Sequence, residues 1–472
     1  MKRLLALLLC LSTLLALAAC GNSNNSANTS PVPSDSAPQQ SDSSGGDYDV
    51  STLEGWGAKI KSESDGKTIT VAMASHPSTE AFQDMVDDFT ALTGIDVVWD
   101  VVEETNLKSK QLLDVQGSGT YDVLMVDAFW MAEYASKGLL VPLADNLADE
   151  TLTPAWFDYE DIMPAYRDGI SSANGVIYAI PSSGETRFIA YRTDLFEKYD
   201  KQPPETMDEF LELAQFFNDC EDVEYGVSMR AQRGIHFASG WMSLMYNFGG
   251  GFLDQTTLDS DNVVVTCTTP ETVESLQYFV DLMKCAPPDV STYTHEEALG
   301  AFISGKTAMW LDATALADQI TDPESSVVAD NVAFVATPTG PAGDGAALAG
   351  WSLGISTASK NSAEAWAFIV YMASKENSLT YVGNGGGATR ASVFENAELA
   401  EAHPSYPAQL VALEAANGLV EKGLSWIPQH EQSNAILEIA GNNGCAALVG
   451  DMTVEEACQT MQTQIEDLLA SS

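Results

Sequence analysis

Residues 68–102 read TITVAMASHPSTEAFQDMVDDFTALTGIDVVWDVV and contain a strand, a helix and a second strand in direct succession. The segment 68–74 is short and apolar, and 95–102 is rich in β-branched residues, so both favour strands. This order predicts parallel strands joined by a helix that crosses the sheet. Between the strands, apolar residues recur at the three- and four-residue steps of an amphipathic helix, at Ala81, Phe82, Met85, Val86, Phe89 and Leu92.

The alternation of strands and helices continues along the chain. The sequence predicts a helix over 107–115, a strand over 121–126 and a helix over 130–137. Together these segments predict an α/β fold. Capping residues or proline mark the starts of further helices, at Thr206 with Glu209, Thr269-Pro270, Asn361 and Thr453 with Glu456.

The composition restricts the classes of partner. The chain has 472 residues, 45% of them hydrophobic, and a formal net charge of −46. This length allows two or three globular units or one large two-lobed body. A polyanion without a cluster of Lys or Arg is repelled by phosphate backbones, so we expect no nucleic-acid partner. The acidity favours solubility and does not identify a substrate.

The N-terminus has the layout of a signal peptide. Lys2-Arg3 precedes an apolar run over 4–19 that is too short to span a membrane. The run ends in Leu17-Ala18-Ala19-Cys20, which resembles a bacterial lipobox. We expect a lipoprotein signal peptide at 1–19, a lipidated Cys20 and a Ser/Asn/Pro-rich tether over 20–65. If Cys20 is incidental, the run is a plain secretory signal, and the location is still extracytoplasmic, at the cell surface or in the periplasm.

Five cysteines remain once Cys10 leaves with the signal and Cys20 is lipidated. An odd number cannot all pair within one chain, and the alternatives are a local bridge between 267 and 285, one between 445 and 458, or buried free thiols. Neither the cysteine spacings nor the five histidines match a metal-binding motif, so we expect no metal and no other cofactor. The five are Cys220, Cys267, Cys285, Cys445 and Cys458.

One motif suggests a nucleotide site. Gly300 to Thr307 fits the pattern G-x-x-x-x-G-K-[ST] of a phosphate-binding loop. That loop must follow a strand and open a helix, because helix-terminal N–H groups hold the phosphates. Here Thr294 and Glu297 cap a helix that runs into the motif, and 307–311 is strand-like. The reversed order argues against nucleotide binding.

A second motif suggests a hydrolase. Gly350 to Gly354 fits G-x-S-x-G, the nucleophile elbow of α/β-hydrolases, with Ser352 as the nucleophile. The elbow needs a helix directly after its serine, whereas 353–357 continues as an apolar, β-branched run. Only His403 and His430 come late enough to act as the base. A secreted esterase that uses Ser352 remains the alternative function.

Longer segments carry a pattern that goes beyond secondary structure. They are YDVLMVDAFWMAEYASKGLLVPLAD (121–145), GVIYAIPSSGETRFIAYRTDLFEKY (175–199), PPETMDEFLELA (203–214), FISGKTAMW (302–310), GWSLGISTASKN (350–361), GGGATRASVF (385–394) and MTVEEACQTMQTQIEDLL (452–469). In this order, along nearly all of the mature chain, they resemble the bacterial extracellular solute-binding proteins of ABC importers, in the large family that includes maltose and other sugar binders.

The resemblance implies a two-lobed periplasmic-binding-protein-like fold of type II. Its lobes would be joined by about three crossings, near 182–185, 350–354 and 388–391, and would close on a solute held between them. The N-terminal lobe would comprise 66–183 plus 355–388, and the C-terminal lobe 186–352 plus 391–472. Such a protein would bind a carbohydrate, from a mono- to an oligosaccharide or a polyol, and deliver it as a monomer to membrane permease subunits without catalysis.

Carbohydrates present apolar C–H faces and many hydroxyls, so their sites combine aromatic side chains with charged groups that bond two hydroxyls at once. The resemblance places Trp241 and Trp351 at such positions, and Phe129 or Trp130 follows a predicted strand. Trp310, in a predicted strand, is a further aromatic candidate. For each of these residues, packing in the core is the alternative. The late aromatic residue of the family is replaced around 429–434, which argues against a long oligosaccharide.

Charged side chains and one histidine are the polar candidates for binding the hydroxyls. Glu185 falls where the family's sugar binders place a carboxylate in the cleft, with a surface turn as the alternative. Asp127, Asp312 and His76 each follow a predicted strand, where open α/β sheets present ligand-binding groups, although Asp127 also suits a helix cap. Arg187 and Arg390 are the cationic candidates, since the chain has 21 Lys and Arg in all. The alternative is that each only neutralises nearby acids.

Overall fold

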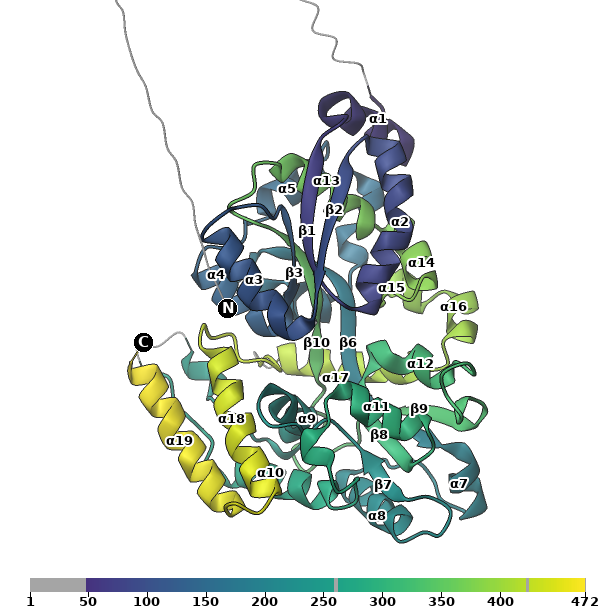
Figure 1. Ribbon diagram of the computed structural model, residues 1–472, viewed down its shortest axis with the longest axis vertical. Helices are drawn as coiled ribbons and strands as arrows, with labels where there is room; N and C mark the ends of the chain where they lie inside the picture. Colours follow the sequence, from purple (N-terminus) through teal and green to yellow (C-terminus); the bar gives the residue numbers. More distant parts are fainter. Residues whose placement is uncertain (1–47, 259–261, 422–423, 472) are drawn as a thin grey trace, which may run out of the picture. The chain divides into compact units, whose positions relative to one another are not determined.

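The long strand β6 (Ala179–Arg192) connects two halves of one mixed sheet (Figure 1). The strand order is β2-β1-β3-β10-β6-β8-β7, and β9 also pairs with β6. The first half of β6 pairs with β10 (Leu348–Ile355) as far as Thr186, and the second half pairs with β8 (Thr307–Ala313) from Arg187 onward. Strand β6 therefore connects an N-terminal lobe, built on β1, β2 and β3, to a C-terminal lobe, built on β7, β8 and β9.

The computed structural model describes residues 48–258, 262–421 and 424–471. The other strands are β1 (Thr68–Ala74), β2 (Asp96–Val102), β3 (Val123–Asp127), β4 (Ser172–Ala173), β5 (Val176–Ile177), β7 (Tyr225–Ser228) and β9 (Val332–Ala336). The helices are α1 (Leu53–Ser64), α2 (Pro77–Thr93), α3 (Glu104–Val115), α4 (Met131–Ser136), α5 (Ala144–Ala148), α6 (Pro164–Gly169), α7 (Thr193–Lys198), α8 (Met207–Asn218), α9 (Ile235–Met245), α10 (Pro270–Met283), α11 (His295–Ile303), α12 (Ala317–Thr321), α13 (Ser362–Met372), α14 (Lys375–Gly383), α15 (Ala391–Phe394), α16 (Ala397–Ala402), α17 (Tyr406–Glu421), α18 (Ser433–Leu448) and α19 (Val454–Ala470).

The N-terminal lobe forms as the strand–helix pattern predicts. β1 runs parallel to β2 on one side and to β3 on the other, so right-handed connections place α2 and α3 on opposite faces of the sheet. The apolar stripe of α2 packs against two later helices. The ring of Phe89 lies 5.6 Å from that of Phe368 on α13, and the ring of Phe82 lies 4.6 Å from that of Tyr381 on α14. On α3, Gln111 donates hydrogen bonds to the main-chain oxygens of β1 and β3.

The C-terminal lobe contains the predicted helices α8, α10, α11 and α19. The capping boxes of α8 and α19 are both formed, as is that of α11, which ends shortly before β8. Gly305, with φ of +79°, makes the turn between α11 and β8. Residues 300–307 thus run from helix to strand, and the exclusion of a phosphate-binding loop is confirmed.

The hydrolase motif also has an ordinary structural position. Ser352 lies inside strand β10, where it is fully buried, and no helix follows it directly. Among the described residues its hydroxyl has no hydrogen-bond partner. The geometry of a nucleophile elbow is therefore absent here, and the esterase alternative has no support.

The expected tether over 20–65 needs a correction at its end. Residues 53–64 form helix α1, because Trp56 and Ile60 bury their side chains against the N-terminal lobe. The ring of Trp56 packs edge-on against Trp156 at 5.4 Å. The signal peptide, Cys20 and the rest of the tether as far as residue 47 lie outside the described residues.

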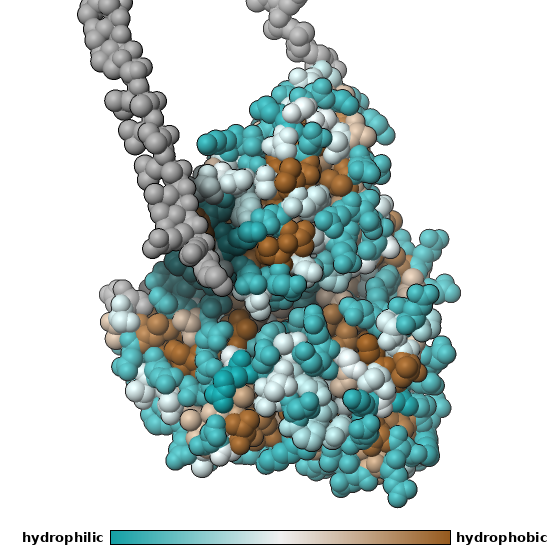
Figure 2. Space-filling view, viewed as in Figure 1, coloured by the Kyte–Doolittle hydropathy of each residue, from teal (hydrophilic) through white to brown (hydrophobic). Residues whose placement is uncertain are grey.

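Cys220, Cys267, Cys285, Cys445 and Cys458 are all free thiols, which answers the pairing question left open by the sequence. No helix among the described residues is long and apolar enough to cross a membrane. Figure 2 shows hydrophilic residues over most of the visible face, with apolar residues in separate small groups.

Candidate ligand-binding site

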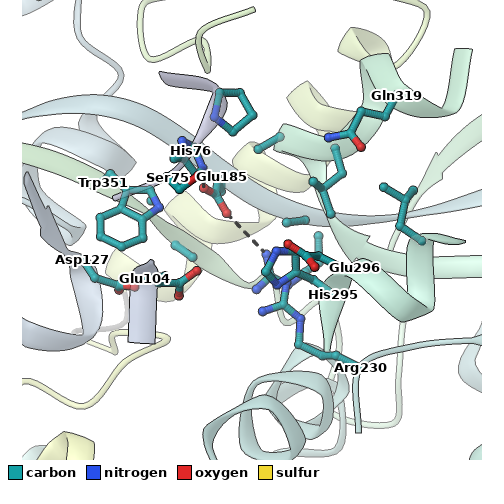
Figure 3. A pocket seen from close by; sticks show the side chains of 18 of the residues that line it. Ser75, His76, Glu104, Asp127, Glu185, Arg230, His295, Glu296, Gln319 and Trp351 are labelled. Carbon is teal, nitrogen blue, oxygen red and sulfur yellow. Dashed lines mark ion pairs between the residues drawn. The ribbon is translucent and has the colours of Figure 1, made fainter. Parts of the chain in front are cut away.

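A cavity of about 350 Å³ opens between the two lobes, beside the strands that cross from one to the other. Glu185 and Arg187 of β6 and Gly350 and Trp351 of β10 line it, so its floor is the shared part of the sheet. The rest of the lining comes from strand ends and helix starts of both lobes (Figure 3). A cavity built in this way changes shape whenever the lobes move.

The N-terminal wall carries residues that follow three neighbouring parallel strands. His76 follows β1, Glu104 follows β2, and Asp127 is the last residue of β3. The carboxyl ends of parallel strands meet at one edge of a sheet, where open α/β sheets bind their ligands. The sequence predicted His76 and Asp127 by this rule, and the same rule applied to β2 identifies Glu104.

Trp351 supplies the main aromatic surface of the cavity. Its ring packs edge-on against Trp130 at 5.5 Å and lies 5.8 Å from the ring of His76, so its orientation is fixed from two sides. Phe129 also lines the cavity and packs edge-on against Trp426 at 5.5 Å. These contacts leave one indole and one phenyl ring facing the space where a ligand would lie.

The tautomer of neutral His76 follows from its position at the start of α2. Its Nδ1 accepts a hydrogen bond from the main-chain N–H of Ser78 at 3.1 Å, so the proton of the neutral ring is on Nε2. That Nε2 lies 3.4 Å from Oε1 of Glu185. The helix start therefore directs a donor from the N-terminal lobe toward the carboxylate of the crossing strand.

A line of charged side chains continues from Glu185 into the C-terminal lobe. We call His76, Glu185, Arg187, Asp312 and Arg230 the charge chain. Oε2 of Glu185 lies 4.0 Å from Nη1 of Arg187, and Nε of Arg187 lies 3.8 Å from Oδ1 of Asp312. Arg230 binds Asp312 through two nitrogens, with Nε 2.8 Å from Oδ2. From Glu185 to Arg230 the chain consists of buried charges of alternating sign, and His76 connects it to the N-terminal lobe.

The pKa shifts in the charge chain reflect this pairing. Burial alone raises the pKa of Asp312, but the positive charges of Arg230 and Arg187 outweigh it and lower the pKa to about 2. For Glu185, burial is likewise outweighed, by His76, Arg187 and Arg230, so its pKa is also lowered. Both carboxyl groups are therefore ionised at neutral pH and hold the arginines by charge-assisted hydrogen bonds and ion pairs.

Glu104 and Asp127 show the opposite behaviour. Burial raises the pKa of Glu104, and burial together with the charge of Glu104 raises the pKa of Asp127 well above its ordinary value. Oδ1 of Asp127 accepts a hydrogen bond from the main-chain N–H of Phe129 at 2.8 Å. Within the described residues, neither carboxyl group forms an ion pair.

The C-terminal wall is formed mainly by helices α11 and α12. His295 and Glu296, at the start of α11, line the cavity, and Gln319 of α12 lies across from them (Figure 3). Burial and the nearby charge of Arg230 lower the pKa of His295 to about 4, so its ring is neutral at physiological pH. This wall thus offers an imidazole, a carboxylate and an amide to a ligand. Between them lie the apolar side chains Leu299, Ile303 and Leu316.

Six residues proposed from the sequence line the cavity, and five do not. Those that line it are His76, Asp127, Phe129, Glu185, Arg187 and Trp351. Trp130 lies behind Trp351, and Asp312, only 1% exposed, lies behind Arg187 and Arg230. These two residues support lining residues instead of facing the cavity.

The other three proposed residues serve the core. The indole of Trp241 is fully buried and donates to the hydroxyl of Ser275 at 3.0 Å, and Trp310 packs on Phe188 at 5.9 Å. Arg390 donates to the main-chain oxygens of Asp158 and Ala373, which holds its own segment against the N-terminal lobe. For these residues the structural alternative holds, because their polar groups already have partners or their rings lie within the core.

Several residues that line the cavity were not predicted from the sequence. Arg230 follows β7, so the strand-end rule that found Asp127 points to it as well. His295 and Glu296 follow Thr294, whose capping box marked a helix start but not the direction of that helix. Gln319 has no signal in the sequence. Among the described residues, no group of three or more His, Cys, Asp or Glu is arranged to hold a metal ion.

Comparisons with known proteins show what this chain is similar to. The model of the family described as bacterial extracellular solute-binding protein matches residues 74–378. The mannitol-binding protein of Pseudomonas aeruginosa is 28% identical over 421 residues, which cover 84% of this chain and 92% of that protein. The erythritol/L-threitol-binding protein of Mycolicibacterium smegmatis is 28% identical over 347 residues, which cover 70% of this chain and 72% of that protein.

Two solved structures are similar over most of the described chain. An ABC transporter solute-binding protein from Agrobacterium vitis with bound D-mannitol is 30% identical, with a TM-score of 0.74 over 86% of this chain and 99% of that one. Another, from Agrobacterium radiobacter in complex with ribitol, is 25% identical, with a TM-score of 0.78 over the same shares of the two chains.

Proposed function

Because the chain belongs to the bacterial extracellular solute-binding protein family, we propose that it is the substrate-binding component of an ABC importer and captures a small polyhydroxylated solute, a polyol or a monosaccharide. The observation that carries the proposal is the cavity between the lobes, where charged side chains surround one indole surface. Carboxylates and arginines each bond two hydroxyls at once, and the indole covers a C–H face.

The size and lining of the cavity favour a short ligand. A volume of about 350 Å³ is near the lower end of the usual range for small-molecule sites. Trp241 and Trp310 are in the core, so the residues that the structure describes around the cavity do not form the row of aromatic surfaces that successive sugar rings would need. The names of the relatives support the same class, since they include proteins for mannitol and for erythritol or L-threitol.

We propose further that the two lobes close on this solute. Their boundaries would be those expected from the sequence, with 66–183 plus 355–388 in one lobe and 186–352 plus 391–472 in the other. Closure would be a population shift, driven by the additional contacts that the solute makes in the closed state. The charge chain supports this proposal, because its members come from both lobes and the crossing strand.

The proposed anchoring depends on Cys20. A lipid on this residue would hold the protein, as a monomer, at the outer face of the membrane, where it would pass its solute to the permease subunits. In the native bacterium, Cys20→Ala should move the protein from the membrane fraction into the soluble extracytoplasmic fraction. A Cys20→Ala variant that stays in the membrane fraction would contradict this part of the proposal.

The binding function itself is tested by calorimetry and melting temperature with erythritol, ribitol, D-mannitol and D-glucose. A bound solute raises the melting temperature by mass action. Glu185→Gln should weaken the binding of the best solute by about tenfold, because a charge-assisted hydrogen bond is replaced by a neutral one. Glu197→Gln, an identical change at an exposed position of helix α7, is the matched control and should leave affinity unchanged. If no polyol or monosaccharide binds, the proposed substrate class is wrong.

A further inference from the structure

The charges around the cavity are not balanced. Apart from Glu296, which is exposed on the C-terminal wall, the lining carboxylates outside the charge chain lie on the N-terminal wall. Arg230 is held by Asp312, and Arg187 lies between Asp312 and Glu185. Two arginines therefore match two ionised carboxylates within the charge chain. Glu104 and Asp127 remain outside this balance, although both line the same cavity.

Neither of these carboxyl groups has a cation of its own among the described residues. The positive charge of Lys108 acts on Asp127, but its Nζ lies 2.6 Å from Oε2 of Glu133. Arg230 and Arg187 act on Glu104, and both are already paired within the charge chain. Asp127 is only 9% exposed, and in the part of the chain that the structure describes its Oδ2 accepts no hydrogen bond. Figure 3 shows Glu104 and Asp127 on the same side of the cavity, with Arg230 and His295 on the other side, and the charge of Arg230 lowers the pKa of Glu104 less than burial raises it.

This inference rests on the proposed function and narrows its substrate class. We propose that the cavity selects a polyol or monosaccharide that carries a primary amine, and that Glu104 and Asp127 hold its ammonium group. An ammonium has three N–H donors, enough to bond both carboxylates, while its positive charge balances theirs. The hydroxyls of the ligand then face the charge chain, and one C–H face lies on Trp351.

The electrostatics of the site support an ammonium ligand. Burying a carboxylate without a partner is unfavourable, and the raised pKa values of Glu104 and Asp127 reflect that cost. A cationic ligand relieves it without protonating either group. The net charge of −46 adds a long-range attraction that concentrates cationic solutes near the protein.

The competing arrangement is a shared proton. In that case one carboxyl group of the pair stays protonated and donates a hydrogen bond to a neutral hydroxyl, and the amine adds nothing. The two arrangements predict different preferences between a polyol and its amino analogue, so binding measurements distinguish them.

The experiment compares D-glucitol with 1-amino-1-deoxy-D-glucitol, and ribitol with 1-amino-1-deoxyribitol, by calorimetry at pH 7 and low salt. The amine should bind more tightly by about tenfold, as expected when a neutral hydrogen bond becomes charge-assisted. Glu104→Gln combined with Asp127→Asn should abolish this preference. Asp84→Asn combined with Asp87→Asn removes the same charge from the exposed surface of α2 and should preserve it.

The outcomes separate the inference from the proposed function. If the neutral polyol binds as tightly as its amine or more tightly, the inference is wrong and the proposed function stands. The same conclusion follows if the amine preference survives in the Glu104/Asp127 variant. If neither the polyols nor their amines bind to the wild-type protein, the proposed function itself fails. The comparison on the wild-type protein decides the matter even if the double variant does not fold.

Discussion

Asp312 does not line the cavity, yet it holds two arginines that do. Its side chain is 1% exposed and binds Arg230 through two hydrogen bonds, with Arg187 close by. Such buried pairing is strongly interdependent, because removing one partner leaves the other charge buried and unpaired. The position of the cavity's cations therefore depends on a residue behind them.

Asp312→Asn should lower the free energy of unfolding at pH 7 by about 3 kcal/mol, in the range found for broken buried ion pairs. The pKa of Asp312 is lowered to about 2 in the folded protein, below its unfolded value of about 3.9. Its contribution to stability is therefore complete above the unfolded pKa and is lost as the pH falls through the folded pKa. Urea unfolding of both proteins between pH 6 and pH 2 measures this.

The difference in stability between wild type and Asp312→Asn should shrink as the pH falls from 4 toward 2. Asp84→Asn, on the exposed surface of α2, gives the control for removing one carboxylate. A difference that stays constant over this range would mean that Asp312 acts through shape and not through its charge.

Helix α11 brings two lining residues to the cavity through the geometry of its first turn. Oε2 of Glu297 accepts from the main-chain N–H of Thr294 at 2.8 Å, and Oγ1 of Thr294 accepts from the main-chain N–H of Glu296 at 3.2 Å. These bonds fix the helix start, and with it the directions of His295 and Glu296. Helix α8 has the same capping box at Thr206 and Glu209, and neither residue lines the cavity.

The two caps allow a matched comparison. Thr294→Ala and Thr206→Ala should each lower the free energy of unfolding by about 1 kcal/mol, the usual effect of losing a helix cap. Only Thr294→Ala should also weaken ligand binding, because α11 and not α8 presents residues to the cavity. Chemical denaturation and calorimetry on both variants check this. Equal losses of affinity would show that the effect comes from general destabilisation.

The two crossing strands lie too close together at one point for any side chain. Gly350 of β10 lies opposite Gly184 of β6 and has φ of +142°. A Cβ atom on Gly350 would lie 2.1 Å from the main-chain oxygen of Ser183. The contact holds the floor of the cavity and the connection between lobes in one place, so a change there affects both.

Gly350→Ala should lower the free energy of unfolding by about 2 kcal/mol or more, as backbone strain and a clash with main chain combine. It should also weaken ligand binding, since Trp351 is the next residue. Gly418→Ala is the control, because Gly418 lies in α17 and a Cβ atom added there would meet open space. That variant should be stabilised by up to about 1 kcal/mol. An unchanged affinity in Gly350→Ala would contradict the role given to this contact.

Local periodicity was sufficient for the elements that the sequence predicted, and the resemblance of seven segments indicated the family. The strand over 68–74 has the bounds that its apolar run predicts, and the capping boxes at Thr206 and Thr453 start helices as expected. These features depend on residues within a few positions of one another, so the sequence contains them directly. The same local reasoning excluded the phosphate-binding loop at 300–307.

The members of the cavity depended on contacts between distant segments. Trp241 and Trp351 have similar local sequences around them, with glycine nearby, yet one is in the core and the other lines the cavity. Arg230 and Asp312 are bound to each other across 82 positions of the chain. The sequence by itself determined the predicted α/β elements and their order, because short-range patterns set them, and it indicated the family through the resemblance of segments along nearly the whole mature chain. Only the tertiary structure decided which side chains face the solute, because burial and charge pairing are fixed when the two halves of the sheet come together.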